Sequence, residues 1–249
     1  KLIAILDPKA NLTKVSNDIL STALNKHIPI LGCRGPALGD GNNSIFSMFG
    51  IEHARGIVYQ KHYKQYDSFT LPMAEFSSHP SLRNLKDRVV LFDNINALEE
   101  GISPDPRLKV VPLLRTQTSD KIWLEQQFDP SSPMVSHTFG PMDMPSPLYT
   151  GMAAEWNLKD GVQPAIVAFG TRSLFENRWI HQGANRELIS QSIDWLLNKT
   201  QQTTRPPSKM SNYKIEIDPN KLLWLEGGVT FIPPFILLLI GFLQWRKRA

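Results

Sequence analysis

Val229-Thr-Phe-Ile-Pro-Pro-Phe-Ile-Leu-Leu-Leu-Ile-Gly-Phe-Leu-Gln-Trp245 is the stretch on which the expected architecture depends. The uncharged run around it extends from Gly227 to Trp245, and as a helix it would span roughly 28 Å, close to a ~30 Å hydrocarbon core. Three consecutive cations follow the run: Arg246, Lys247 and Arg248. Because interfacial tryptophans flank membrane spans and cations favour the cytoplasmic side, this pattern predicts a transmembrane helix with a cytoplasmic C-terminus.

Two prolines limit the length of this helix. Pro233 and Pro234 lie inside the run, and proline is tolerated in the first helical turn but not in the interior. The regular helix is therefore expected to begin at Pro233 and to be short. A buried core helix of a soluble protein is the alternative, which the terminal cations disfavour. Upstream, Trp224 is expected to act as a second interfacial anchor.

The totals restrict the class of protein. The chain has 249 residues and a formal charge of +4, and about +1 remains once the three tail cations are removed. Such a small excess of positive charge gives no indication of a nucleic-acid-binding surface. A single cysteine, Cys33, excludes an internal disulfide. Because Lys1 is not a start methionine and the chain opens in a strand pattern, we infer that these residues belong to a longer protein.

Strand and helix patterns alternate along residues 1–198. Asn185–Leu197 is an amphipathic helix candidate, and the alternation predicts an α/β body, flavodoxin- or Rossmann-like, with a mostly parallel sheet. Residues 199–228 are expected to form a linker and juxtamembrane segment, and residues 229–249 the membrane helix and basic tail. Helices are also predicted at 15–24 and 45–49. Strands are predicted at 1–6, 28–31, 56–60, 89–92, 108–115, 152–156 and 165–169, and a long surface loop at 128–147.

Cys33 is the strongest enzymatic candidate. Leu31-Gly-Cys-Arg-Gly35 follows a strand and superficially matches a nucleophile elbow, which presents its nucleophile on a sharp glycine-rich turn. Pro36 and further glycines follow, which suits a loop better than a helix. Gly35, Gly39 and Gly41 match neither a dinucleotide fingerprint nor a P-loop. A buried or loop cysteine without catalytic function is therefore the preferred interpretation, and no cofactor is expected.

Other polar and aromatic residues give weaker signals. The six histidines form no zinc-like spacing, so no metal is expected. Asp7 ends the first strand, where α/β proteins often place functional groups, but an Asp-Pro turn is preferred. Arg172, Glu176, Arg178 and Arg186 are interpreted as a solvated face. A glycan-binding surface is a lesser alternative that would use three aromatics: Tyr149, Trp156 and Trp179.

Several motifs, in order, resemble the GldG-like auxiliary component of gliding-motility-type ABC transporters. They cover nearly the whole chain and end with the Pro-rich apolar helix and its basic tail. The chain departs from the family at Thr171 and Ser173, where the family usually carries aspartates. The matching segments are Ile5-Leu-Asp-Pro8, Phe49-Gly-Ile-Glu52 with Gly56-Ile-Val-Tyr59, His79-Pro80 before Val89–Phe92, Val111-Pro-Leu-Leu-Arg-Thr116 with Trp123, Ala165–Leu174, and Asn185–Leu196.

The resemblance implies a periplasmic α/β domain, distantly like amidotransferase and intraflagellar-transport folds, that is anchored in the bacterial inner membrane. It implies ABC permease and ATPase partners, with an envelope or secretion-machinery protein as a further partner, and brings no catalytic residues. The expected function is thus a non-enzymatic accessory subunit, with Gly241 as the small residue for close packing on the permease. The alternative is a membrane-tethered, amidotransferase-like hydrolase that uses Cys33.

Overall fold

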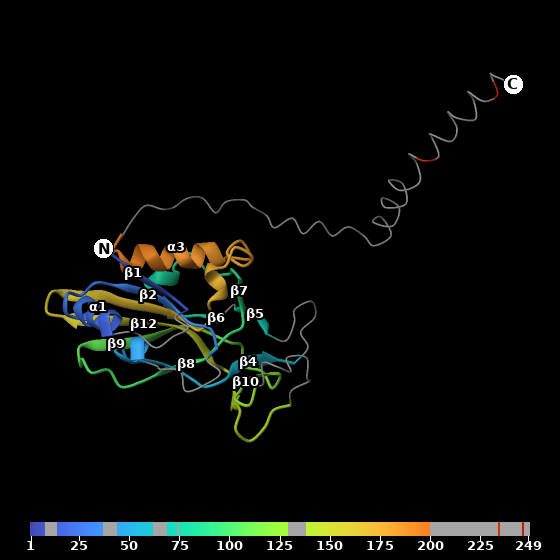
Figure 1. The fold of residues 1–249 in the computed structure, drawn as a ribbon, viewed down its shortest axis with the longest axis horizontal. Helices are drawn as coiled ribbons and strands as arrows, with labels where there is room; N and C mark the ends of the chain where they lie inside the picture. The colour runs from blue at the N-terminus through green and yellow to red at the C-terminus, as the bar shows by residue number, and fades with distance from the viewer. Residues whose placement is uncertain are drawn as a thin grey trace. The chain divides into compact units, whose positions relative to one another are not determined.

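The computed structural model describes residues 1–7, 14–36, 44–61, 69–73, 75–128 and 138–199, together with Pro234 and Arg246. The chain divides into two compact units, Lys1–Thr204 and Arg205–Ala249. Everything that follows on the fold concerns the first unit, which Figure 1 shows in colour.

The first unit is dominated by strands. Its two longer helices are α1 (Lys14–Asn25) and α3 (Asn185–Leu196). Shorter helical elements are α2 (Ser44–Ser47) and the 3-10 turns η1 (Pro80–Leu82) and η2 (Ser173–Phe175). The strands are β1 (Ile3–Leu6), β2 (Ile30–Cys33), β3 (Ile51–His53), β4 (Ile57–Gln60), β5 (Thr70–Met73), β6 (Glu75–Phe76), β7 (Val90–Asp93), β8 (Leu98–Glu100), β9 (Leu108–Arg115), β10 (Ile122–Glu125), β11 (Met144–Pro145), β12 (Tyr149–Leu158) and β13 (Gly161–Phe169).

The main sheet is mixed. Its eight strands include the path β1-β2-β13-β12-β8-β3, and β9 pairs with β12 and β6. Only β1/β2 and β2/β13 are parallel pairs; the pairs of β12 with β13, β9 and β8, of β9 with β6 and of β8 with β3 are antiparallel. Two small antiparallel sheets, β11-β10-β4 and β5-β7, complete the unit.

The prediction of a mostly parallel, Rossmann-like sheet is therefore wrong. The reason is visible at the β12–β13 hairpin, where two residues, Lys159 and Asp160, connect long strands and Gly161 adopts a φ of +123°. A two-residue connection can only join antiparallel strands, because a parallel pair needs a crossover of about a dozen residues or more. The described chain from β3 to β13 contains no α-helix that could make such crossovers.

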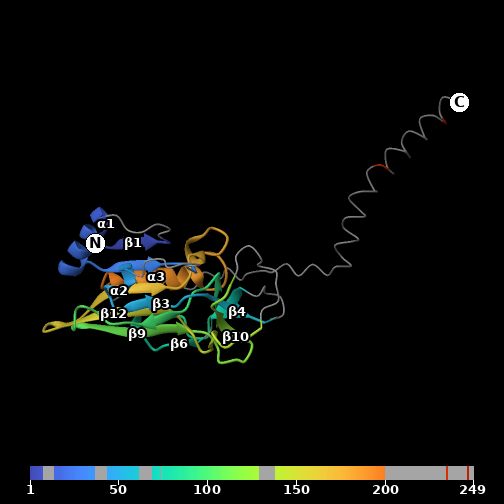
Figure 2. The ribbon, with the colours of Figure 1, turned by 60° about the horizontal axis from the view of Figure 1, so that its bottom comes forward.

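Helices cover both faces of the parallel part of the sheet. Side chains of β2 and β13 alternate, so Leu31 and Phe169 pack toward the core that includes α3, whereas Ile30 and Ile166 pack toward α1 and α2. Figure 2 shows β1 as the outermost strand of this layer. The buried ring of Phe46, a residue of α2, packs against Gly32 of β2, where a Cβ atom would clash with the ring.

Several local predictions agree with these elements. The strand over 108–115 is β9, and the helix over 185–197 is α3. The pairing of β9 with β12 shifts register next to Pro112, which indicates a β-bulge. Pro29 lies in the predicted strand at 28–31, and a proline usually confines a strand to a sheet edge. Instead β2 begins just after it, continues through Cys33 and lies between β1 and β13. The surface loop expected at 128–147 includes β11, and its residues 129–137 lie outside the described part.

No helix in the described part of the chain is long and apolar enough to cross a membrane. The helix predicted at 229–249 lies outside the described residues except for Pro234 and Arg246, which are helical and exposed. The other residues of the predicted anchor also lie outside: Trp224, Pro233, Gly241, Trp245, Lys247 and Arg248.

Candidate functional site

The carboxyl ends of β1, β2 and β13 meet at one edge of the sheet. These strands are neighbours and run parallel, so the residues that follow them, Asp7, Gly35 and Arg172, come together. This is the edge at which α/β proteins usually bind ligands. Asp7 takes a left-handed φ of 46°, which aspartate tolerates better than most residues, and its N–H donates to the Cys33 carbonyl at 2.9 Å.

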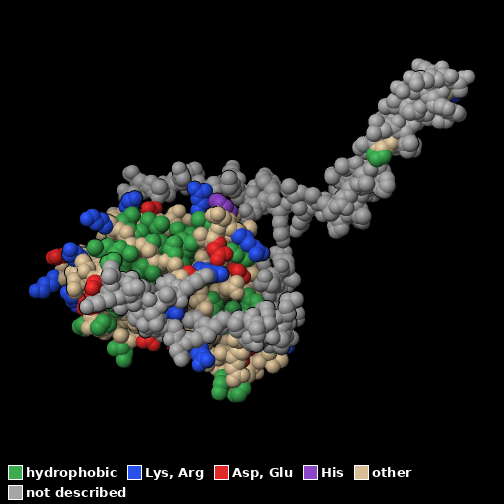
Figure 3. Space-filling model, in the orientation of Figure 1, with side chains coloured by type: hydrophobic (Ala, Val, Ile, Leu, Met, Phe, Trp, Pro, Cys, Tyr) green, Lys and Arg blue, Asp and Glu red, His purple; other side chains and the backbone are tan. Residues whose placement is uncertain are grey.

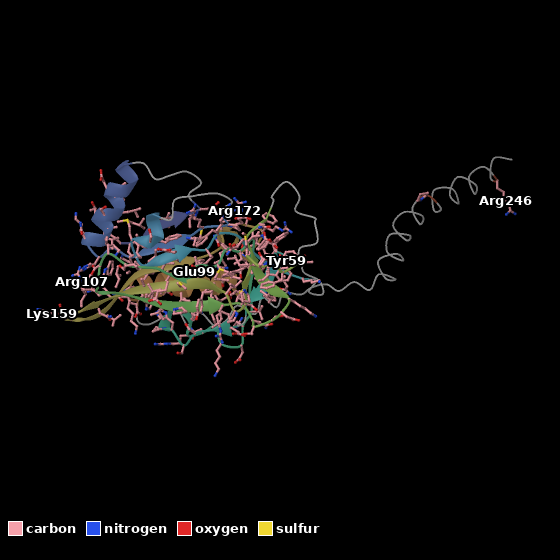
Figure 4. All side chains as sticks on the ribbon, turned by 90° about the horizontal axis from the view of Figure 1, so that it is seen from below. Tyr59, Glu99, Arg107, Lys159, Arg172 and Arg246 are labelled. Atoms are coloured by element: carbon pink, nitrogen blue, oxygen red, sulfur yellow. The ribbon has the colours of Figure 1, made fainter. Side chains whose placement is uncertain are left out.

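Asp7 is the centre of a small polar network. Its Oδ1 accepts a hydrogen bond from the Gly35 N–H at 3.2 Å, and its Oδ2 lies 3.3 Å from the Arg172 guanidinium. Arg172 also pairs with Glu176 at 3.1 Å, one helical turn further along. About half of the Arg172 side chain is exposed, so these ion pairs are weak and screened by salt. Figure 4 shows Arg172 away from the end of the domain that Arg107 and Lys159 mark.

Cys33 lies beneath this network and not on the surface. Its side chain is fully buried in the core that includes α3. The pKa of the thiol is raised to about 12, mainly by burial; a hydrogen bond from the Asp7 backbone opposes this shift, and the Asp7 carboxylate adds a smaller upward contribution. A reactive cysteine needs the opposite, an accessible thiol with a lowered pKa. The nucleophile elbow that was considered as the less favoured alternative is not formed, because Cys33 lies within the strand as the last residue of β2.

Thr171 and Ser173 join β13 to β7. The Thr171 hydroxyl donates to the Asp93 carbonyl at 2.5 Å, and the Ser173 hydroxyl accepts from the Asp93 N–H at 3.1 Å. The two hydroxyls also lie 2.9 Å apart, and both side chains are buried. At the positions where the resembled family carries aspartates, this chain therefore has hydroxyls that satisfy the backbone of a neighbouring strand.

A second polar constellation was missed from sequence. His79 Nδ1 lies 2.8 Å from Ser81 Oγ, and His79 Nε2 lies 3.1 Å from Glu155 Oε1. This order resembles a Ser–His–acid triad, but Ser81 is fully buried, and its backbone N–H donates to the same His79 nitrogen at 3.2 Å. The arrangement is the N-cap of η1. The sequence showed only His79-Pro80, a turn signal, and nothing linked it to Glu155, 76 residues away.

The tautomer of His79 follows from this cap. Since Nδ1 accepts from the Ser81 N–H, Nε2 must carry the proton and donate to Glu155. Burial lowers the pKa of the imidazole, and the hydrogen bond with Glu155 opposes that shift. The ring of Trp195 from α3 packs against it with 4.7 Å between centroids. This histidine thus ties η1, β12 and α3 together.

Other predicted site residues do not converge. Of the three aromatics proposed for glycan binding, Trp156 is fully buried, Trp179 is 9% exposed and only Tyr149 is clearly exposed, so they make no stacking platform. Gly39 and Gly41 lie outside the described residues. Clefts lie elsewhere in the described part of the chain. One of about 310 Å³ includes Gln60, Thr116 and Lys121, and one of about 580 Å³ includes His27, Asp105 and Arg107.

Comparison with known proteins identifies a shared fold. No protein-family model matches the chain, and no curated protein matches it. The chain is similar to the solved structure of the mmIFT52 N-terminal domain, with a TM-score of 0.52 and 16% identity, over 79% of this chain and 76% of that chain. At this identity the likeness shows the fold alone, and the resemblance to the transporter-auxiliary family stays a prediction.

Proposed function

We propose that the chain is a non-enzymatic accessory subunit of a bacterial inner-membrane ABC transporter, whose mixed α/β domain docks on the permease or links it to an envelope partner. The observation that carries the non-enzymatic part is the state of Cys33, a buried core thiol with a raised pKa. The proposed association with a transporter is supported by the order of the sequence motifs, which resembles that of the GldG-like family.

The neighbouring groups support the same proposal. Around Cys33, Thr171 and Ser173 are bonded to the backbone of β7, and Asp7 is engaged by Gly35 and Arg172. These bonds hold strands and loops in place and give the edge a structural role. The hydrogen bonds of His79 with Ser81 and Glu155 are also structural, since His79 caps η1 and packs against Trp195 of α3.

Affinity purification from native membranes tests this function. A tag placed after Ala249 is used to recover the chain in mild detergent, and the co-purifying proteins are identified by mass spectrometry. We expect an ABC permease and ATPase in a constant ratio to the chain. Recovery of the chain alone, in a soluble fraction, would contradict the proposal. A tagged, unrelated membrane protein of similar abundance controls for non-specific capture.

A further inference from the structure

The cleft of about 310 Å³ lies where β4, β5 and the segment before β10 come together (Figure 1). Its volume is at the small end of the range for ligand pockets, which is about 300–1,000 Å³. Two buried polar side chains, two lysines and two apolar side chains contribute to its lining: Gln60, Thr116, Lys61, Lys121, Leu71 and Ile122.

Gln60 is the last residue of β4, where it pairs with Ile122 of β10. Its side chain is only 4% exposed, and it lines the cleft. Within the described part of the chain, the side-chain amide of Gln60 forms no hydrogen bond. Burying an amide without a hydrogen-bond partner is unfavourable. An amide of this kind beside a cleft therefore indicates a partner that comes from outside the fold.

Thr116 supplies a second buried polar group to the same cleft. Its side chain is 1% exposed, and its hydroxyl oxygen accepts a hydrogen bond from the Leu148 N–H at 2.9 Å. A hydroxyl can donate as well as accept, and the hydrogen of this one has no acceptor among the described residues. Gln60 and Thr116 thus offer the cleft both hydrogen-bond donors and a carbonyl acceptor.

Lys61 and Lys121 lie directly opposite each other at the end of the β4–β10 ladder. The Lys61 N–H donates to the Lys121 carbonyl at 2.8 Å, which continues the register that pairs Gln60 with Ile122. Both side chains are exposed, and neither forms an ion pair in the described part of the chain. Like charges opposite each other in an antiparallel pair are destabilising. An anion bound in the cleft would relieve this repulsion, since Asp120 is the single carboxylate in the described lining.

We propose that this cleft binds the carboxyl-terminal end of a peptide, with its carboxylate between Lys61 and Lys121 and its last peptide group on Gln60. A glutamine amide matches a peptide group, because each has an N–H donor and a C=O acceptor. Leu71 and Ile122 give an apolar wall for the terminal side chain. Figure 3 shows cations and anions interspersed on the face turned to the viewer, so no broad positive surface competes there for a carboxylate.

Binding is measured by saturation-transfer NMR, with the full 249-residue chain in deuterated mild detergent and N-acetyl-alanyl-alanine as the probe. We expect a dissociation constant in the millimolar range or below, and binding at least about tenfold weaker for the same peptide with an amidated carboxyl end. Acetate, which has no peptide group, should also bind more weakly. No binding at about 10 mM probe, or equal binding of the amidated peptide, would overturn the proposal.

The source of the peptide is decided by alanyl-alanine, which has a free amino group. If the site takes free peptides, Asp120 should pair with that ammonium group and alanyl-alanine should bind about tenfold more tightly than the acetylated probe. If it takes the end of a partner protein, the acetylated probe should bind as well or better, because a longer chain must continue beyond it.

Gln60→Leu tests the central contact. Leucine is of similar size but has no amide, so we expect binding of the acetylated probe to weaken about tenfold. Because the amide has no partner in the described part of the free chain, the melting temperature of the unliganded variant should not fall. Gln182→Leu changes an exposed glutamine outside the described lining and should leave binding unchanged. Unchanged binding by Gln60→Leu would overturn the proposal.

The lysine pair is tested by combining Lys61→Gln with Lys121→Gln. The unchanged chain should bind the probe more weakly as salt rises, because salt screens charges. The double variant should bind at least about tenfold more weakly at low salt and lose this salt dependence. Lys159→Gln is the matched control, and Figure 4 shows Lys159 at the opposite end of the domain from Tyr59, which precedes Gln60. Binding that withstands both salt and the double variant would contradict the site.

Discussion

The ring of Phe46 rests directly on the backbone of Gly32. A Cβ added at Gly32 would lie 2.3 Å from Cε1 and 2.7 Å from Cζ of that ring. Phe46 is only 2% exposed, and its ring also stacks on His53 with 5.0 Å between centroids. The contact therefore joins the middle of the parallel strands to α2, and neither partner has free space into which to move.

Gly32→Ala is expected to destabilise the domain by about 1–3 kcal/mol, because the added methyl overpacks a closed core. For a unit of roughly 200 residues this lowers the melting temperature by several degrees. Gly35→Ala is the matched control, since a Cβ there meets nothing nearer than 3.7 Å. Urea unfolding of both variants measures the difference. Equal stability of the two would show that Phe46 does not pack as described.

Thr171→Val should cost about 1–3 kcal/mol, because it removes a buried hydroxyl that donates to the Asp93 carbonyl and accepts from the Ser173 N–H. Thr22→Val provides the comparison. The Thr22 hydroxyl donates to the Asp18 carbonyl at 2.7 Å, but on the exposed surface of α1, where water can replace it. We expect a change of less than about 0.5 kcal/mol there. A small effect at both positions in unfolding experiments would count against a structural role for Thr171.

Arg172→Gln should lower stability by less than about 1 kcal/mol, since its pairs with Asp7 and Glu176 are exposed. The difference from the unchanged chain is expected to disappear in about 1 M salt, where the screening length is only about 3 Å. Unfolding curves at low and high salt give both values. A loss of several kcal/mol that persists in salt would mean that the network is buried or coupled to a larger rearrangement.

Stability should fall as the pH drops below neutrality. Burial lowers the pKa of His53 from 6.5 to about 3, so below pH 6.5 the unfolded chain binds a proton that the folded chain does not. This single group would remove about 2 kcal/mol between pH 7 and pH 5. The lowered pKa of His79 acts in the same direction.

His53→Gln is the variant that isolates this effect, because glutamine does not titrate. Each protein is compared with its own stability at pH 7, which removes the cost of the substitution itself. The slope of stability against pH between 7 and 5 should be smaller in the variant. Parallel slopes would show that His53 is protonated equally in the folded and unfolded chains.

Most of the longer elements were predictable, because their hydrophobic patterns are clear. The strands at 108–115 and 165–169 and the helix at 185–197 all lie where the patterns indicate. Some short strands were missed, among them β5 and β8, although β1, β2, β4 and β7 lie at predicted strands. β8 contains Glu99 and Glu100, and β5 contains Pro72, so their composition is that of a loop. Such strands form because neighbours already in place supply the hydrogen bonds.

The direction of the strands was predicted wrongly, although the sequence contained a signal. Asp160-Gly161 between two strands is a typical hairpin turn, and it requires antiparallel neighbours. Among the described strands, only β1, β2 and β13 pair in parallel. Because their carboxyl ends lie at the same edge, Asp7, Gly35 and Arg172 come together there. A buried or loop position was the preferred interpretation of Cys33, and its burial is confirmed. It results from the extension of β2 by two residues beyond the predicted strand at 28–31.

The central claim, that the carboxyl edge of the parallel strands is structural and not catalytic, is tested most directly by the reactivity of Cys33. It is the single cysteine, so alkylation of the full chain with iodoacetamide, followed by intact-mass spectrometry, reports on this thiol alone. We predict that near neutral pH the folded chain reacts at least roughly 100-fold more slowly than the urea-unfolded chain, since the thiol is buried and protonated. Alkylation of the folded chain as fast as or faster than the unfolded chain would contradict the account and restore Cys33 as a candidate nucleophile.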